Sequence, residues 1–169
     1  DENKIKEVTL QVDSLDKPVE LSGKWLFTRE DKKENSTNEV NINSWKVVTL
    51  PSAWTKFYGD KKLYNVAWHK RVLSFDEKLI GQKVNLYAVT FWPQFELYID
   101  GNLILSQGEL KSKKDNITTG GMVGTFKITK KIHTISVRFD SFLMKGFHAK
   151  PFQLRAYKEN DFFINLWDF

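Results

Sequence analysis

Hydrophobic residues along this chain occur in short runs in which apolar and polar positions alternate, and turn residues separate the runs. Nowhere does the helical spacing i, i+3, i+4, i+7 persist for twelve residues. This pattern predicts strands with one buried face and little helix. Ten runs are candidate strands: Ile5 to Val12, Lys24 to Arg29, Trp45 to Leu50, Ala67 to Phe75, Lys83 to Thr90, Phe95 to Asp100, Asn102 to Gln107, Met122 to Ile128, His133 to Phe139 and Phe152 to Tyr157.

The clearest turn signal lies between two of these runs. From Phe95 to Asp100 the apolar residues stand at odd positions and the polar ones at even positions, and Asp100-Gly101 then leads into the next run. An Asp-Gly pair between alternating runs predicts a tight hairpin. Because the strands are short and lack the helix spacing of βαβ units, we expect an all-β fold, a jelly roll or β-sandwich of about 8 to 10 strands.

Length and composition narrow the protein class. A chain of 169 residues fits one domain with a substantial core. The formal net charge of +5 is basic but modest, so we expect no nucleic-acid partner. A hydrophobic share of 41% fits a globular chain better than a disordered or membrane-embedded one. The aromatic share of 14% exceeds what such a core needs, and it indicates a β-rich core, a binding surface or both.

Signals for catalysis and for metal or cofactor binding are weak. The sequence has no Cys, which excludes disulfides, thiolate metal sites and a Cys nucleophile. His69, His133 and His148 are isolated, without the spacing of paired metal ligands. There is no nucleophile elbow, phosphate-binding loop, dinucleotide fingerprint or Asp-rich calcium string. We therefore expect a non-catalytic chain with no metal and no cofactor, although paired carboxylates could still meet in space.

Aromatic residues near predicted strand ends are the best candidates for ligand recognition. Rings in such places can stack on the apolar faces of sugars, while neighbouring polar side chains bind the hydroxyls. The expected ligand contacts in this part of the chain are Trp54, Arg71, Trp92, Gln94 and Gln107, with Glu96 as a further hydrogen-bond acceptor.

Each of these side chains also has a structural interpretation. Trp54 and Trp92 could fill the core, which is what we expect of Trp25, Trp45 and Trp68. The arginines at 71 and 138, each flanked by apolar strand residues, could lie in a pocket or on the polar face of a strand.

Three polar segments lie between predicted strands. Residues 30–43 are interpreted as a loop. Residues 140–151 link two strands, and there we expect Lys145 and His148 to line one wall of a ligand mouth, the alternative being a loop with no binding role. Residues 111–121 are interpreted as a second loop. The longer segment from Lys111 to Lys131 accounts for the whole net charge, and it predicts either a solvated edge and loop or a contact with an anion or lipid headgroup.

Four motifs in this order resemble a galactose-binding-like jelly roll. They are Leu21 to Phe27 (Leu-Ser-Gly-Lys-Trp-Leu-Phe), Trp45 to Trp54 (Trp-Lys-Val-Val-Thr-Leu-Pro-Ser-Ala-Trp), Tyr64 to Arg71 (Tyr-Asn-Val-Ala-Trp-His-Lys-Arg) and Leu97 to Gly101 (Leu-Tyr-Ile-Asp-Gly). Such a resemblance covers roughly Leu21 to Arg155, and it implies the galactose-binding-domain type of β-sandwich.

Two families share this motif order. The sugar-binding domain of glycoside hydrolase family 2 is similar over Ala67 to Arg71 and at Asp100-Gly101, although His69 stands where that family usually has Tyr. The extracytoplasmic sensor domain of bacterial seven-transmembrane receptors with diverse intracellular signalling modules is similar further along, over Asp100 to Gly108 and Ser141 to Leu154.

The C-terminal residues favour the receptor family. Phe162 to Phe169 is rich in apolar side chains and resembles a juxtamembrane stretch, so we expect one domain over 1–160 and a membrane-proximal connector over 161–169. The leading hypothesis is a non-catalytic, periplasmic ligand-binding sensor domain of a bacterial inner-membrane signalling protein. Its ligand would be a carbohydrate or another small organic molecule. The resemblance implies a nucleotide cyclase, diguanylate cyclase or histidine kinase output elsewhere in the full protein.

Two alternatives of other classes stay open. One is an accessory carbohydrate-binding module of a glycoside hydrolase family 2 enzyme. The other is a protein-interaction or dimerisation domain with no small ligand, in which exposed aromatic residues and the segment from Lys111 to Lys131 form an interface, for example that of a homodimer.

Overall fold

The computed structural model describes residues 2–53, 66–89, 94–107, 121–140, 146–147 and 152–159. Its short helices are α1 (Glu2–Glu7) and the 3₁₀ turns η1 (Lys33–Ser36) and η2 (Glu77–Leu79). Its strands are β1 (Thr9–Val12), β2 (Val19–Glu20), β3 (Gly23–Thr28), β4 (Lys46–Leu50), β5 (Ser52–Ala53), β6 (Ala67–Phe75), β7 (Lys83–Val89), β8 (Gln94–Ile99), β9 (Asn102–Gln107), β10 (Gly121–Lys127), β11 (Ile132–Asp140), β12 (Gly146–Phe147) and β13 (Phe152–Ala156).

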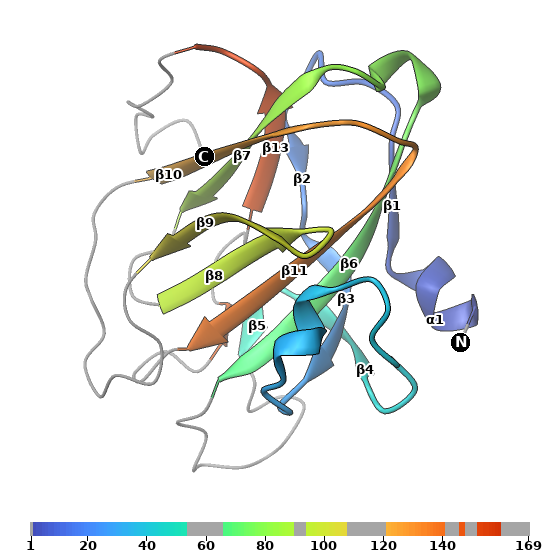
Figure 1. The fold of residues 1–169 in the computed structure, drawn as a ribbon, viewed down its shortest axis with the longest axis vertical. Helices are drawn as coiled ribbons and strands as arrows, with labels where there is room; N and C mark the ends of the chain where they lie inside the picture. The colour runs from blue at the N-terminus through green and yellow to red at the C-terminus, as the bar shows by residue number, and fades with distance from the viewer. Residues whose placement is uncertain are drawn as a thin grey trace.

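Two sheets lie face to face and enclose the core (Figure 1). The large sheet has the order β4-β3-β6-β11-β8-β9, with β1 beside β6, and the small sheet has the order β10-β7-β13-β2. A separate short pair joins β5 to β12. The predicted all-β sandwich with little helix is therefore confirmed.

Alternate residues of each strand point into the space between the sheets. On β8, Phe95, Leu97 and Ile99 are buried in this main core, while Glu96 and Tyr98 lie half-buried on the opposite face. The predicted alternation of this strand is confirmed. Burial of the odd positions fixes which face of the sheet carries the even ones, because successive side chains of a strand point to opposite sides.

The three tryptophans expected in the core are all buried, but in two places. Trp25 is fully buried between the sheets. Trp45 and Trp68 belong to a second cluster with Val8 and Leu26. That cluster lies on the outer face of the large sheet, since Trp68 alternates with inward-facing core residues along β6.

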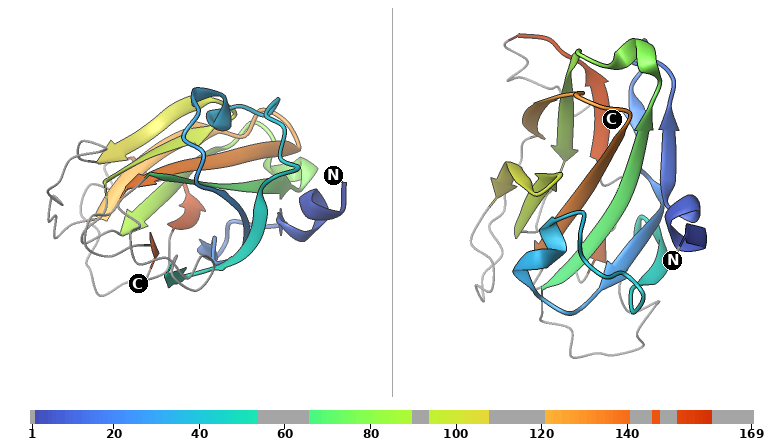
Figure 2. Two further views of the ribbon diagram at one scale, coloured as in Figure 1. Left: turned by 90° about the horizontal axis from the view of Figure 1, so that it is seen from below. Right: turned by 45° about the vertical axis from the view of Figure 1, so that its right-hand side comes forward.

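Residues 29–45, called the strap below, lie across this outer face and cover the second cluster. In Figure 1 the strap is the blue-to-cyan segment in front of the large sheet, and Figure 2 shows it on the side away from the small sheet. Val40 and Ile42 of the strap pack against the cluster. The polar composition predicted only a loop here, whereas the strap contains η1 and buries Asn35 and Ser36. The strap is therefore an ordered layer, because the apolar outer face needs a cover.

The N-terminal segment differs from the prediction. Ile5 to Val12 is not one strand: α1 comes first, and β1 follows and pairs in parallel with β6. The helix places Ile5 against the second cluster, and the turn that follows the helix places Val8 within it. Residues three apart share a helix face, so this short apolar run satisfies helical spacing as well as strand spacing.

Candidate functional site

A pocket of about 380 Å³ opens on the outer face of the large sheet, where the strap leaves part of that face uncovered. A volume of this size is within the range of small-molecule sites. The sheet and the strap both contribute to its lining. The described residues of this lining are Asp31, Lys33, Ser36, Trp68, Glu96, Tyr98, Gly101 and Arg138.

Strand register brings the sheet residues of the pocket together. Arg138 of β11 pairs with Trp68 of β6 on one side and with Glu96 of β8 on the other. Directly opposed residues on one sheet face lie within side-chain contact. Tyr98 follows Glu96 by one strand repeat, and its ring stacks on Trp68 with centroids 5.8 Å apart and planes at 30°.

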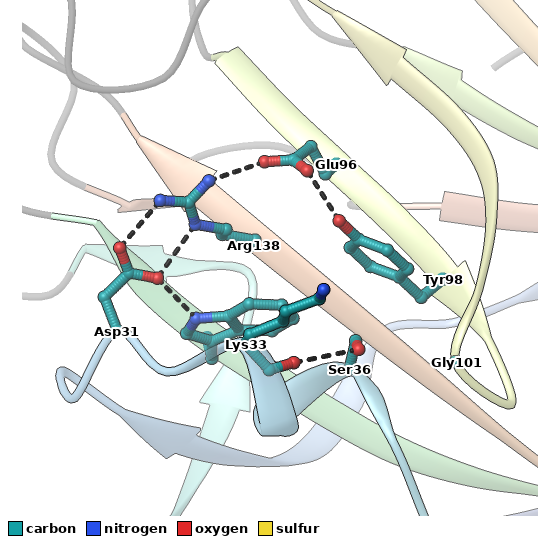
Figure 3. A pocket seen from close by; sticks show the side chains of 8 residues that line it. Asp31, Lys33, Ser36, Glu96, Tyr98, Gly101 and Arg138 are labelled. Atoms are coloured by element: carbon teal, nitrogen blue, oxygen red, sulfur yellow. Dashed lines mark hydrogen bonds and ion pairs between the residues drawn. The ribbon is translucent and has the colours of Figure 1, made fainter.

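An ionic network centred on Arg138 lines one side of the pocket (Figure 3). Its Nε and Nη2 donate to Asp31 at 2.8 and 2.7 Å, and its Nη1 donates to Glu96 at 2.7 Å. The Trp68 indole N–H donates to Asp31 at 2.9 Å, and the Tyr98 hydroxyl donates to Glu96 at 2.5 Å. Planar guanidinium groups recognise carboxylates in this two-bond manner, so the network holds both acids in fixed positions.

The network also shifts the pKa of its members. Hydrogen bonds to Asp31 raise the pKa of Arg138, against the opposing effect of burial, and Glu96 raises it further. Burial raises the pKa of Tyr98 to about 12, with the hydrogen bond to Glu96 acting in the same direction. Arg138 is therefore a permanent cation, and the Tyr98 hydroxyl keeps its proton near neutral pH.

Lys70 anchors the strap next to the pocket. The residue is 3% exposed on the outer face of β6, its Nζ donates to the Thr37 carbonyl, and it lies 5.5 Å from the centroid of the Trp45 ring. Burial lowers the pKa of Lys70 to about 8. Because Thr37 follows η1 directly, this contact holds Ser36 and the rest of the turn over the sheet.

The turn at Asp100-Gly101 closes the other side of the pocket. Asp100 has φ of 47° and Gly101 has φ of 82°, so the hairpin predicted from this pair is confirmed. The Asp100 carboxylate accepts hydrogen bonds from Asn38 of the strap at 2.9 Å, from the Thr134 amide at 2.9 Å and from His133 Nδ1 at 2.6 Å. Asp100 thereby ties the turn to both the strap and β11.

These bonds make Asp100 a source of pH-dependent stability. Burial alone would raise the pKa of Asp100, but the bonds from His133, Asn38 and Thr134 outweigh it and lower the pKa to about 2. The stabilisation is fully present above the ordinary value of 3.8 and is lost as the pH falls toward 2.

We expect Asp100→Asn to remove this pH dependence. The variant should be less stable than the wild type above pH 4 by on the order of 1 kcal/mol, after screening by solvent, and the difference should vanish near pH 2. Urea unfolding over that pH range measures it, with Asp16→Asn as an exposed control. Parallel stability curves for wild type and Asp100→Asn would show that Asp100 is not the responsible group.

Arg71, a predicted ligand contact, lies on the inward face of β6 and not in the pocket. Its Nη1 donates to the carbonyls of Leu21 and Ser22 at 3.0 and 2.7 Å. Its guanidinium also packs on Gly23, where an added Cβ would lie 3.3 Å from it. Burial lowers the pKa of Arg71. The observed contacts join β6 to the start of β3, and the ligand role of Arg71 stays a prediction.

The neighbouring His69 is also part of the core. It is fully buried and packs against Phe27 and Phe139, with ring centroids 5.0 and 6.2 Å away. Burial lowers the pKa of His69 to about 3, so its ring is neutral near neutral pH.

Gln94 and Gln107 lie on neighbouring strands, at the opposite end of the sheet from the Asp100-Gly101 turn, but their side chains point to opposite faces of the sheet. Gln107 pairs with Phe95, the neighbour of Gln94, and both glutamines are buried. Arg71 is remote from both glutamines. Along β11, Arg71 pairs with Ile135 and Gln94 pairs with Asp140. These two partners are five residues apart, which corresponds to about 17 Å along a strand. Trp54, Trp92, Lys145 and His148 lie outside the described residues. Among the predicted contacts within the described residues, Arg71, Gln94 and Gln107 are thus not gathered at one place.

Sequence reasoning named Trp68, Glu96 and Arg138 without assigning them to one site, and it missed Asp31, Lys33, Ser36 and Tyr98. The available signal was the alternation along β8, which places Glu96 and Tyr98 on one face. The sequence did not indicate that Arg138 pairs with both Trp68 and Glu96, because strand register depends on contacts between residues that are remote in sequence.

Within the described ranges, no group of three or more His, Asp or Glu side chains is arranged to hold a metal ion. The helices found there are too short or too polar to cross a bilayer.

Comparison with known proteins gives likeness in structure only. No protein-family model matches the sequence, and no curated protein matches it. A β-glycosidase from Bacteroides vulgatus superposes with a TM-score of 0.62 at 16% identity, over 82% of this chain and 20% of that chain. A β-glucuronidase from an uncultured Clostridium sp. superposes with a TM-score of 0.62 at 14% identity, over 85% of this chain and 29% of that chain. A β-glucuronidase from glycoside hydrolase family 2 superposes with a TM-score of 0.63 at 13% identity, over 81% of this chain and 17% of that chain.

The chain therefore spans less than a third of the length of these enzymes. At such identities the likeness concerns the fold, and the chain is similar to a β-sandwich part of larger glycosidases.

Proposed function

We propose that this chain is a non-catalytic carbohydrate-binding domain of a larger glycoside-processing protein. The observation that carries the proposal is the pocket, in which an aromatic pair lies beside a fixed ionic network. The likeness to part of several glycosidases supports the same class, and it fits the accessory-module alternative better than the receptor sensor.

The pocket chemistry suits a sugar. Each sugar hydroxyl donates one hydrogen bond and accepts others, so it needs donors and acceptors close together. Arg138 and Lys33 supply donors, and Glu96 supplies acceptors. The half-buried Tyr98 ring offers an apolar surface next to them. Arg138, Glu96 and Tyr98 are held by other contacts before any ligand arrives, which reduces the ordering cost of binding.

Calorimetric titration with a panel of oligosaccharides tests the proposal. We expect at least one sugar to bind the wild type, and Tyr98→Ala to weaken that binding about tenfold or more, because the ring and its hydroxyl are both lost. Tyr157→Ala is the matched control, since Tyr157 is 41% exposed and lies outside the pocket. Circular dichroism must show that both variants fold. A panel without any binding sugar would overturn the proposal.

A further variant separates the two predicted locations of the ligand. If the sugar binds in the pocket described above, Gln107→Ala should leave the affinity unchanged, because Gln107 is not among the residues that line it, whereas the strand-end prediction requires the affinity to fall. The periplasmic location, the membrane-proximal connector, the signalling output and the homodimer stay predictions, and the comparisons do not support the sensor role.

A further inference from the structure

The hydrogen-bonding capacity of the pocket is only partly used. A guanidinium has five N–H groups, and Arg138 uses three of them on Asp31 and Glu96. Each carboxylate oxygen can accept two hydrogen bonds. Glu96 Oε1 accepts one from Arg138 and Oε2 accepts one from Tyr98. Within the part of the chain that the structure describes, Arg138 therefore keeps unused N–H groups and Glu96 keeps unused acceptor positions, and the bond between the two places them next to each other.

The charges around these free positions are balanced. Asp31 and Glu96 are negative, and Lys33 and Arg138 are positive, so the described residues that line the pocket carry no formal net charge. The two cations differ in their surroundings. Arg138 is enclosed between both carboxylates, whereas the exposed ammonium of Lys33 has no hydrogen-bond or ion-pair partner among the described residues.

An anionic ligand group meets a conflict at this place. To reach the free N–H groups of Arg138 it must approach Asp31 and Glu96, which already bond to the same guanidinium at 2.7 to 2.8 Å. Like charges at such separations repel strongly in a half-buried site. Lys33 compensates little, because a mobile, solvated ammonium gains less than 1 kcal/mol from a typical surface ion pair.

A neutral hydroxyl meets no such conflict. It can donate to Glu96 and accept from Arg138 at once, using both free positions. We propose that the pocket selects neutral pyranoses over uronic acids and that Glu96 is the residue that sets this preference. This inference rests on the proposed carbohydrate-binding function, and it specifies the sugar class for the same site.

Matched sugar pairs test the preference without a known natural ligand. Methyl β-glucoside and methyl β-galactoside are compared with the corresponding methyl uronides, which differ only in carrying a carboxylate at C6. Binding is followed by chemical shifts of the protein in NMR titrations. We expect each uronide to bind at least tenfold more weakly than its neutral partner.

Glu96→Gln tests the assigned residue. The substitution keeps the size and one oxygen acceptor but removes a negative charge. We expect the ratio of neutral to acidic affinity to fall to about threefold or less, with the uronide gaining most of the change. Glu77→Gln is the matched control, since it removes the same charge from an exposed position in η2, outside the pocket.

The outcomes separate the two proposals. Tighter or equal binding of the uronides would overturn the preference while leaving the carbohydrate-binding function intact. An unchanged ratio in Glu96→Gln would remove Glu96 as the determinant. Binding of none of the four glycosides, together with no hit from the oligosaccharide panel, would overturn the proposed function and this inference with it.

Discussion

Arg138→Ala is expected to lower the affinity for sugar at least tenfold and the free energy of unfolding by about 2 kcal/mol. The side chain is 22% exposed and bonds both Asp31 and Glu96, whose side chains are 21% and 22% exposed. Without the guanidinium these two acids stay half-buried and lose their shared cation. The strap also loses its tie to β11, because Asp31 belongs to the strap.

Two further variants isolate the cause. Arg138→Lys keeps the charge but cannot bond Asp31 through two nitrogens, so we expect a smaller loss of stability and a similar loss of affinity. Lys24→Ala breaks an exposed pair with Glu7 at 3.3 Å, and it should change stability by less than about 1 kcal/mol. Calorimetric titration measures the affinity for sugar, and urea unfolding measures the free energy of unfolding. Unchanged affinity in a folded Arg138→Ala protein would exclude Arg138 from the binding site.

Trp25→Ala is expected to produce the largest loss of stability, about 4 kcal/mol. The side chain is fully buried between the sheets, and its ring lies 6.3 Å from that of Phe152 on the small sheet. Its indole N–H donates to the Leu21 carbonyl at 2.7 Å, a carbonyl that also accepts from Arg71. Truncation therefore leaves a large cavity and weakens a buried hydrogen-bond network. Urea unfolding followed by circular dichroism measures the effect.

Trp25→Phe separates these two contributions, since it keeps an aromatic ring and removes only the donor and part of the volume. We expect it to cost about 1 to 2 kcal/mol. Leu103→Ala serves as the exposed control, because Leu103 is 54% exposed, and its effect should be close to zero. A Trp25→Ala protein as stable as the Leu103→Ala protein would contradict the placement of Trp25 in the core.

The strands could be predicted from the sequence because short runs rich in apolar and β-branched residues are bounded by turn signals. In β6 and β9 the predicted bounds, Ala67 to Phe75 and Asn102 to Gln107, agree with the structure. The hairpin was predictable for a local reason, since Asp100 and Gly101 tolerate positive φ. By contrast, the run from Ile5 fits both a helix and a strand, and the contact with the outer-face cluster decides for α1.

The candidate site could not be predicted, because it depends on two arrangements that are not local. One is the register that sets Arg138 between Trp68 and Glu96. The other is the strap, whose polar residues indicated only a loop, and which delivers Asp31 to Arg138 across 107 positions of sequence. Residues with recognisable ligand chemistry, such as Arg71, were chosen by type, whereas the fold directs that side chain into the core.

The central claim is that a carbohydrate binds in the pocket between the strap and the large sheet. An NMR titration of the ¹⁵N-labelled protein with a bound sugar tests it most directly, because the Trp68 indole N–H and the Arg138 Nε–H each give a side-chain signal and both donate to Asp31. The account predicts that these two signals shift together and saturate at the affinity measured by calorimetry. Saturable sugar binding that leaves both signals unmoved would contradict it.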